Sequence, residues 1–252
     1  MDHLRPIERA CYRTGVLLIG AGLFHLAVLL ITGDTWYGPV SWRKPMTFGL
    51  SFGLTLITIT WVSSYLRLGE RTRTGMLTVF ASACGLEVGL ITVQAWRGVP
   101  SHFNLSTPVD SVIARVLAGG GAVLIGVIVF LTVMAFRTGA EVAPGMLAAV
   151  RAGLVALDVS LLLGAVMIAT GITRAISGDQ QSAYVVGGAL KSAHGVTLHG
   201  VLVLPALAWL LARTDRTEAE QHRLVRTAVA GYAGVCLLAV VWSAVGLVRL
   251  ET

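Results

Sequence analysis

Seven long apolar runs alternate with short polar connections along the chain. Each run holds about 20 residues, which is the length that an α-helix needs to cross the apolar layer of a bilayer. The pattern therefore predicts an all-α, polytopic membrane protein: a seven-transmembrane-helix bundle that forms a single integral membrane domain over residues 1–252. The predicted spans cover residues 14–32, 46–66, 74–96, 112–136, 147–172, 193–212 and 226–248.

Composition supports a membrane protein and excludes several other classes. Hydrophobic residues make up 55% of the 252 residues and charged residues only 13%, whereas soluble domains carry roughly 25% charged residues. The three cysteines form no CxxC pair, so neither a disulfide framework nor a zinc ribbon is indicated. The sequence also lacks P-loop, HExxH and GxSxG motifs, which argues against ATP-driven and familiar hydrolase chemistry.

Basic residues are divided unevenly between the two ends of the predicted spans. If the spans alternate in direction, twelve arginines lie on the side of the N-terminus, and five arginines and two lysines lie on the other side. The positive-inside rule then predicts a cytoplasmic N-terminus and an extracytoplasmic C-terminus. Because the arginines mark helix ends and form no single patch, we expect no nucleic-acid partner. The abundance of Ala, Val, Gly and Arg suggests the cytoplasmic membrane of a bacterium.

Besides arginines near their ends, the apolar runs contain six His, Glu, Gln and Asp side chains. Such groups are costly at membrane depth and usually face a bundle interior or a water-filled cavity. With a rise of about 1.5 Å per residue, the histidines and the glutamine lie in the extracytoplasmic half, and both carboxyl groups lie near the middle. We therefore predict one polar cavity that opens to the extracytoplasmic side. Its residues are His25, Glu87, Gln94, Asp158, His194 and His199.

Glu87 is the strongest candidate for chemistry in this set. A carboxyl group at mid-membrane depth is suited to carry a proton or to act as a general acid. Glu87 and Gln94 are seven residues, or two helical turns, apart and so share one helix face. Asp158 is the second candidate acid or base, although hydrogen bonding inside the bundle would also account for it.

His194 and His199 lie at the start of the sixth run, and each is followed by a glycine. A separation of five residues corresponds to about 140° around a helix, so the two imidazoles cannot easily chelate one ion together. Gly195 and Gly200 remove side-chain bulk beside the imidazoles, which suits a flat macrocycle or a close helix contact. For either histidine alone, a hydrogen bond between helices is the competing interpretation.

The connections predicted to be extracytoplasmic are rich in Trp, Tyr, Pro and Gly together with Arg and His. This mixture suggests ordered loops, although an aromatic belt with arginines that reach the headgroups would leave the same pattern. Lys44 precedes Pro45 at the mouth of the second span and is a candidate catalytic residue for an anionic or carbonyl-bearing ligand. The candidate substrate-binding residues are Arg43, Gln94, Trp96, Arg97, His102 and Asn104.

Glycines recur in two of the runs. Gly49 and Gly53 form a GxxxG motif in the second run, and Gly119, Gly120 and Gly121 follow one another in the fourth. Small residues in membrane helices let neighbouring backbones approach closely, so we expect these glycines to serve helix packing.

The polar residues are compatible with three functions. The first is a redox protein that holds haem b or a transition metal between helices, with a possible quinone partner. Its axial ligands would be His25 with His199, which form the candidate metal pair, or His25 with His194. Glu87 would handle protons beside the quinone.

The second function is a membrane-embedded acid–base enzyme that acts on a lipid or isoprenoid. Glu87 and Asp158 would be its acid and base, and His25 and Lys44 would assist. The third is a proton-coupled transporter of a small molecule. The number of predicted spans argues against transport, because seven spans do not divide into two inverted halves.

Overall fold

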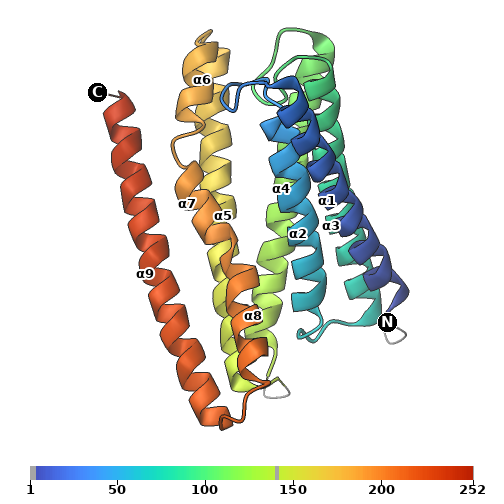
Figure 1. Cartoon of the computed structure of the whole chain (residues 1–252), viewed down its shortest axis with the longest axis vertical. Helices are drawn as coiled ribbons and strands as arrows, with labels where there is room; N and C mark the ends of the chain where they lie inside the picture. Colours follow the sequence, from blue (N-terminus) through green and yellow to red (C-terminus); the bar gives the residue numbers. More distant parts are fainter. Residues whose placement is uncertain (1–3, 140–141, 252) are drawn as a thin grey trace. The chain divides into compact units, whose positions relative to one another are not determined.

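A computed structural model describes residues 4–139 and 142–251. All regular secondary structure in this part of the chain is α-helical, and turns and loops join the helices (Figure 1). Seven of its helical segments are long and apolar enough to cross a membrane, which confirms the predicted all-α, multi-pass architecture. The helices are α1 (Pro6–Thr32), α2 (Arg43–Ser63), α3 (Glu70–Trp96), α4 (Pro108–Arg137), α5 (Pro144–Ile176), α6 (Gln180–Val186), α7 (Lys191–Leu198), α8 (Gly200–Leu211) and α9 (Glu218–Glu251).

The second span ends earlier than predicted, at Ser63 rather than at residue 66. From Ser64 to Leu66 the backbone N–H groups bond to carbonyls three residues back, at 3.0 to 3.1 Å, so the chain leaves the α-helix through tighter turns. The hydroxyl of Ser64 donates to the carbonyl oxygen of Trp61 at 2.6 Å. Serine competes for backbone acceptors in this way, and the hydrophobic pattern alone does not reveal it.

The sixth span was predicted as one helix over 193–212, but the structure divides this region between α7 and α8, with the break at His199. Gly195 and Gly200 flank the break and weaken the helix on both sides of it. Pro205, inside α8, has no N–H to donate to the carbonyl group one turn earlier. A further helix, α6, precedes α7 and is separated from it by a turn that contains Gly187 and Gly188.

The contacts between residues define two compact units, which are described separately. Unit 1 comprises the described residues of Met1–Thr60, Glu70–Leu124 and Gly171–Tyr184. Unit 2 comprises those of Trp61–Gly69, Ile125–Thr170 and Val185–Thr252.

In unit 1, α3 turns one continuous buried face toward its neighbours, and α1 packs against it. The buried residues recur every three or four positions, as expected for a helix face that packs against a core. They are Arg73, Met76, Leu77, Phe80, Ala83, Cys84, Glu87, Val88, Ile91 and Gln94. Two of the predicted polar residues, Glu87 and Gln94, therefore lie on the same buried face, as their spacing indicated.

The backbones of α1 and α2 meet at glycines. A Cβ atom added to Gly49 would lie 2.7 Å from the nitrogen of Gly22, and one added to Gly53 would lie within van der Waals overlap of the Gly15 carbonyl. The GxxxG motif of the second span thus packs against α1, as predicted. Because side-chain bulk would separate the two helices, glycine is required at these contacts.

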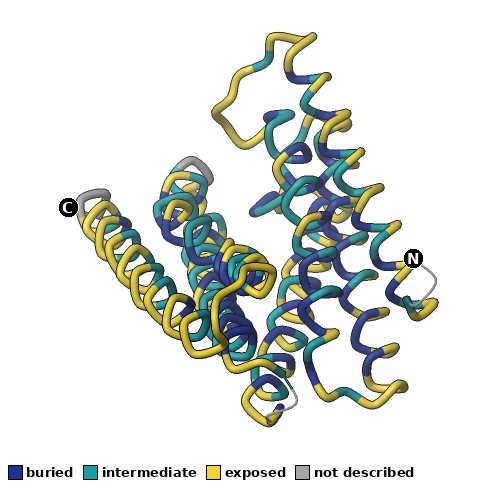
Figure 2. Tube along the Cα trace, turned by 60° about the horizontal axis from the view of Figure 1, so that its bottom comes forward, coloured by how far each residue is buried: buried dark blue, intermediate teal, exposed yellow. Residues whose placement is uncertain are grey.

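In unit 2, α9 packs against α7 and α8 and is otherwise largely exposed, as its mainly yellow trace in Figure 2 shows. Only 6% of its most apolar window is buried, and the Trp242 side chain is 79% exposed. The helices α5 and α8 come much closer together: a Cβ atom on Gly153 would lie 2.8 Å from the Cα of Val201. An apolar, exposed helix of this length is suited to face lipid.

Candidate functional site

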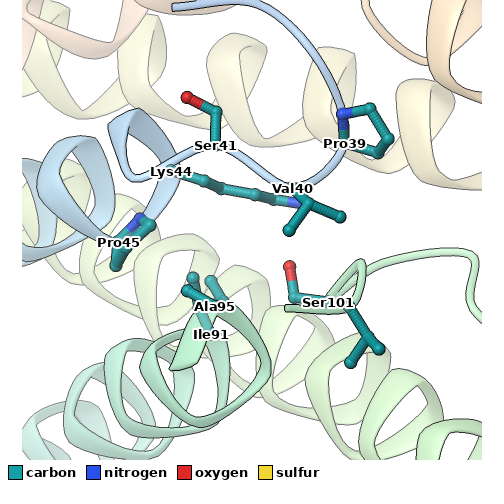
Figure 3. Close-up of a pocket in the computed structure, with 9 residues that line it drawn as sticks. Pro39, Val40, Ser41, Lys44, Pro45, Ile91, Ala95 and Ser101 are labelled. Carbon is teal, nitrogen blue, oxygen red and sulfur yellow. The ribbon is translucent and has the colours of Figure 1, made fainter. Parts of the chain in front are cut away.

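A small pocket lies in unit 1, between the loop that leads into α2 and the end of α3 (Figure 3). The space between its walls is about 180 Å³, with the open solvent at its mouth included. The lining is mostly apolar, with one lysine and two serines among its residues. The lining residues are Pro39, Val40, Ser41, Lys44, Pro45, Ile91, Ala95, Val99 and Ser101.

The polar groups of this pocket approach it from two sides. The Lys44 side chain lies extended across the pocket toward Val40, and the Ser101 hydroxyl points into the same space from the opposite wall (Figure 3). The Ser41 hydroxyl is committed elsewhere, since it donates to the carbonyl oxygen of Thr35 at 2.6 Å. Lys44 also lies in the first turn of α2, where the helix dipole favours an anion, although the backbone N–H groups of Arg43 and Lys44 are already bonded to Ser41.

His102 adds a titratable group next to the pocket. The Ser101 hydroxyl and the Nδ1 of His102 lie 3.0 Å apart, within hydrogen-bond distance. Burial of the ring, and to a smaller extent the positive charge of Lys44, hold the pKa of His102 well below its ordinary value. His102 is therefore a neutral imidazole at physiological pH, able to exchange a hydrogen bond with Ser101.

The loop that carries Ser101 and His102 is fixed by aromatic contacts. Phe103 adopts a positive φ of 61°, a conformation that costs a non-glycine residue roughly 1–2 kcal/mol. Its ring fills the space left by the missing side chain of Gly171 and packs against Tyr184, with ring centroids 5.9 Å apart. The Tyr184 hydroxyl donates to the carbonyl oxygen of His102 at 3.3 Å. These contacts position the loop that carries His102.

Next to this loop, Gln94 and Arg97 meet Asp110 in a buried polar network. The Gln94 amide donates to Asp110 Oδ1 at 2.9 Å, and Arg97 donates to the same oxygen at 2.8 Å. Arg97 also donates to the side-chain oxygen of Gln94. Thr107 donates to the other carboxylate oxygen at 2.6 Å, and its hydroxyl accepts the backbone N–H of Asp110 at 3.2 Å. Gln94 and Arg97 are thus occupied in joining α3 to the start of α4.

His25 lies in an aromatic cluster of unit 1. Its Nδ1 is 2.7 Å from the carbonyl oxygen of Ala21, and its Nε2 accepts a hydrogen bond from the Trp96 indole at 3.2 Å. This assignment makes Nδ1 the protonated nitrogen. The Trp42 ring stacks on the imidazole with centroids 6.0 Å apart. Both ring nitrogens of this buried histidine are therefore engaged.

Arg43 and Asn104 have local roles in their loops. Arg43 donates from Nε to the carbonyl oxygen of Trp36 at 2.7 Å. The side-chain oxygen of Asn104 accepts the backbone N–H of Ser106 at 3.1 Å, which forms a turn. Neither side chain lines the pocket.

Glu87 lies deeper in unit 1 and is only 4% exposed. Its Oε1 has no hydrogen-bond partner within the described residues. The carboxyl group fits against the backbone of α4, because a Cβ atom on Gly120 would lie 2.5 Å from Oε1. Of the three consecutive glycines, only Gly120 makes such a contact.

The remaining three predicted residues belong to unit 2. Asp158 accepts a hydrogen bond from Thr132 at 2.6 Å. His194 packs on α5, where its Nδ1 lies 2.7 Å from the carbonyl oxygen of Ser160. His199 is exposed at the break between α7 and α8, with its Nδ1 2.6 Å from the carbonyl oxygen of Gly195.

The two glycines that follow these histidines differ. A Cβ atom on Gly200 would lie 2.8 Å from the Cβ of Ala156, so this glycine serves a close helix contact. A Cβ atom added to Gly195 would meet no neighbouring atom within 4 Å.

The six residues expected to line one cavity thus fall into the two units. In unit 1, His25, Glu87 and Gln94 each contact a different partner, while Lys44 lines the pocket and His102 follows the lining residue Ser101. Within the described residues, no group of three or more His, Cys, Asp or Glu side chains is arranged to hold a metal ion.

Two residues of these sites were missed from the sequence. Ser101 is inconspicuous because a serine in a loop carries no distinctive pattern. Asp110 had a usable signal, since Thr107-Pro108-Val109-Asp110 places a threonine three residues before a carboxylate at the start of a helix. Comparisons of the chain with protein-family models, with curated proteins and with solved structures give no match.

Proposed function

We propose that this protein binds an amphipathic molecule of the lipid or isoprenoid class by a carboxylate or carbonyl head group, which occupies the pocket of unit 1. The observation that carries the proposal is the lining of the pocket, where Lys44 and the Ser101 hydroxyl lie within mainly apolar walls. Ligand sites typically combine such walls with a few polar groups that fix orientation. An ammonium group gives a charge-assisted hydrogen bond to an oxyanion, which is about twice as strong as a neutral one.

The size of the pocket favours a head group over a whole ligand. The space between its walls, about 180 Å³ including the open solvent at the mouth, is too small to enclose a complete amphipathic molecule. The apolar remainder of the ligand would lie outside the pocket, against the exposed apolar surface of the membrane helices. The neutral imidazole of His102 lies behind the pocket wall, where its Nδ1 can exchange a hydrogen bond with the Ser101 hydroxyl that faces the head group.

A set of three probes with one chain length tests this proposal: oleate, oleyl alcohol and oleylamine. Binding to the detergent-purified protein is measured by native mass spectrometry and by the shift in thermal unfolding. We expect oleate to bind most tightly and oleylamine least, because the head group meets the positive charge of Lys44. We expect Lys44→Met to weaken oleate binding at least tenfold, and Ser101→Ala to weaken it several-fold.

The chain supplies a matched control, because Lys191 is its only other lysine. Lys191 is exposed at the start of α7 and does not line the pocket. Lys191→Met should leave oleate binding within twofold of the wild-type value. The proposal is refuted if Lys44→Met and Lys191→Met bind oleate equally, or if oleylamine binds as well as oleate does.

A redox function with haem b or a metal is the second candidate, and the orientation of the imidazoles favours it. In His25, His194 and His199 alike, Nδ1 lies 2.6 to 2.7 Å from a backbone carbonyl oxygen. Histidines that ligate a metal typically donate the other ring N–H in this manner, which leaves Nε2 as the ligand atom. His194 and His199 suit this role better than His25, whose Nε2 already accepts a bond from Trp96.

An absorption spectrum and a metal analysis of one purified sample test the redox candidate. A Soret band that is lost in His199→Ala or His194→Ala, and retained in His222→Ala, would support ligation by the α7–α8 region. A colourless sample without bound metal, obtained from cells supplied with haem precursors and metals, would rule the redox candidate out and leave the head-group proposal untouched.

We also infer that the N-terminus is cytoplasmic and the C-terminus extracytoplasmic, in a bacterial cytoplasmic membrane. The division of twelve basic residues against seven supports this orientation. The pocket of unit 1 then opens near the extracytoplasmic surface, because the connections 33–42 and 97–107 lie on that side.

A further inference from the structure

We propose that the carboxyl group of Glu87, seated against Gly120 of α4, is a reversible proton-binding site inside the membrane. This site is separate from the head-group pocket, and the inference does not rest on the proposed ligand. The carboxylate takes up one proton to become a carboxylic acid and later returns it to water, so the step needs no co-reactant.

The first observation is an unpartnered atom in a closed environment. Glu87 is 4% exposed, and its Oε1 has no hydrogen-bond partner in the described chain. The carboxyl group also meets the backbone N–H of Gly121, but a buried carboxylate oxygen that lacks a partner destabilises the charged form, and adding a proton removes the charge. The other buried carboxylates of unit 1 differ, since Glu8 is paired with Arg5 at 2.9 Å and Asp110 with Arg97 at 2.8 Å.

The second observation is a seat of matching shape on the neighbouring helix. The absence of a side chain at Gly120 admits the carboxyl group, because an added Cβ would lie 2.5 Å from Oε1 and 3.4 Å from the carboxyl carbon. Gly119 and Gly121 have open space at the corresponding position. Helix packing alone would not require glycine at position 120, because the group that approaches it is the Glu87 side chain and not a backbone.

The surroundings favour a proton over a metal ion. One carboxyl group cannot coordinate a hard cation, which takes six or more oxygen ligands, and no cluster of three ligating residues is found within residues 4–139 and 142–251. The titratable group nearest on α3 is Cys84, one turn away and fully buried. On α4, Arg115 is exposed, and Asp110 is bonded to Gln94 and Arg97.

Labelling with N,N′-dicyclohexylcarbodiimide tests the proposal on the full-length protein in lipid vesicles. This apolar reagent adds to a protonated carboxyl group, and the oxygen-linked adduct rearranges to a stable N-acylurea that peptide mass spectrometry locates. We expect Glu87 to be labelled at least tenfold faster than the exposed Glu218. We also expect its labelling rate to fall at least threefold as the pH is raised from 5.5 to 8.5.

The glycines of α4 supply matched variants. Gly120→Ala places a methyl group in the seat and displaces the carboxyl group, so labelling of Glu87 should fall at least threefold. Gly119→Ala and Gly121→Ala should label as the wild type does. Equal labelling of the Gly120→Ala and Gly121→Ala variants overturns the proposal.

The wild-type protein alone also decides the question, even if Gly120→Ala folds poorly. A Glu87 that labels no faster than Glu218 is not held in an apolar seat as a protonated acid. A labelling rate that stays constant from pH 5.5 to 8.5 shows that the Glu87 carboxyl group does not exchange its proton with water. Either result contradicts the proposal.

Discussion

Most of the polar residues predicted to line a cavity in the membrane-spanning helices form hydrogen bonds with nearby groups. His25 donates to a carbonyl of its own helix and accepts from Trp96, and Gln94 bonds to Asp110. Glu87 and Asp158 differ, because one carboxylate oxygen of each has no hydrogen-bond partner in the described residues, and that of Glu87 lies against Gly120 of α4. At the residue scale, unsatisfied hydrogen-bonding capacity is therefore a better guide to chemistry than depth in the membrane.

The bond between Trp96 and His25 predicts an effect on stability. Trp96→Phe keeps an aromatic ring but removes the indole N–H, which leaves the Nε2 of a buried histidine without a donor. We expect the free energy of unfolding to fall by about 1–3 kcal/mol. Thermal unfolding in detergent measures the change. Trp242→Phe, at a position 79% exposed on α9, should change it by less than about 0.5 kcal/mol, and equal losses in the two variants would contradict the role of the bond.

The low pKa of His102 predicts that the protein loses stability in mild acid. Below the pKa of about 6.5 for a histidine in an unfolded chain, the unfolded state binds a proton that the folded state does not. Above about pH 6.5, His102 therefore does not lower the free energy of unfolding. Below that pH the free energy of unfolding falls as the pH decreases, by up to about 1.4 kcal/mol per pH unit for one proton.

Unfolding temperatures of two variants between pH 7.5 and 5 check this prediction. His102→Asn should flatten the dependence on pH relative to the wild type. Lys44→Met should flatten it only partly, because burial of the His102 ring lowers the pKa more than the charge of Lys44 does. A wild-type slope that His102→Asn leaves unchanged would show that other groups cause the acid sensitivity.

Which residues lie within the membrane could be predicted from the apolar runs, but their partners could not. The spacing of Glu87 and Gln94 correctly predicts a shared buried face. Nothing in the spacing indicates that Gln94 bonds to Asp110 while Glu87 meets Gly120, because these contacts depend on how α3 and α4 pack. Ser101 was missed for the same reason, since it gains its significance only from the position of Lys44 across the pocket.

At the scale of the helices, the close approach of α1 and α2 predicts an effect of added methyl groups. Gly49→Ala or Gly22→Ala places a Cβ within 2.7 Å of the opposite backbone, so the helices must move apart. We expect a loss of about 1–3 kcal/mol in the free energy of unfolding, as is typical of overpacking.

Gly20 provides the control on the same helix, because its Cβ position is open. Gly20→Ala should be neutral, or should stabilise α1 by up to about 1 kcal/mol through its higher helix propensity. Thermal unfolding of the three variants gives the comparison. A destabilisation by Gly20→Ala as large as that by Gly49→Ala would show that the backbone contact is not the cause.

The spans themselves could be predicted because about 20 consecutive apolar residues admit few structures other than a helix in a membrane. The break at His199 was not predicted, although Gly195, Gly200 and Pro205 were all visible in the sequence. Each of these residues is tolerated in membrane helices, because neighbouring groups can satisfy the freed backbone. The break lies beside the tight contact between Gly153 and Val201, which the sequence does not reveal.

At the scale of the whole molecule, the distribution of charge predicts the orientation in the membrane. Twelve basic residues against seven is a clear bias, and the residues counted lie close to the ends of the helices, where the positive-inside rule applies. The connection between α2 and α3 should therefore be cytoplasmic, and the connection between α1 and α2 extracytoplasmic.

Single cysteines introduced into a cysteine-free variant test this orientation. Gly69→Cys lies in the connection between α2 and α3, and Gly38→Cys lies in the connection between α1 and α2. Both replace exposed residues. In intact cells, a membrane-impermeant maleimide should label Gly38→Cys and leave Gly69→Cys unlabelled until the cells are opened. The opposite pattern would invert the topology and would move the pocket that contains Lys44 to the cytoplasmic surface. A head group delivered from outside the cell would then be excluded, so this experiment also decides from which side a ligand must reach Lys44.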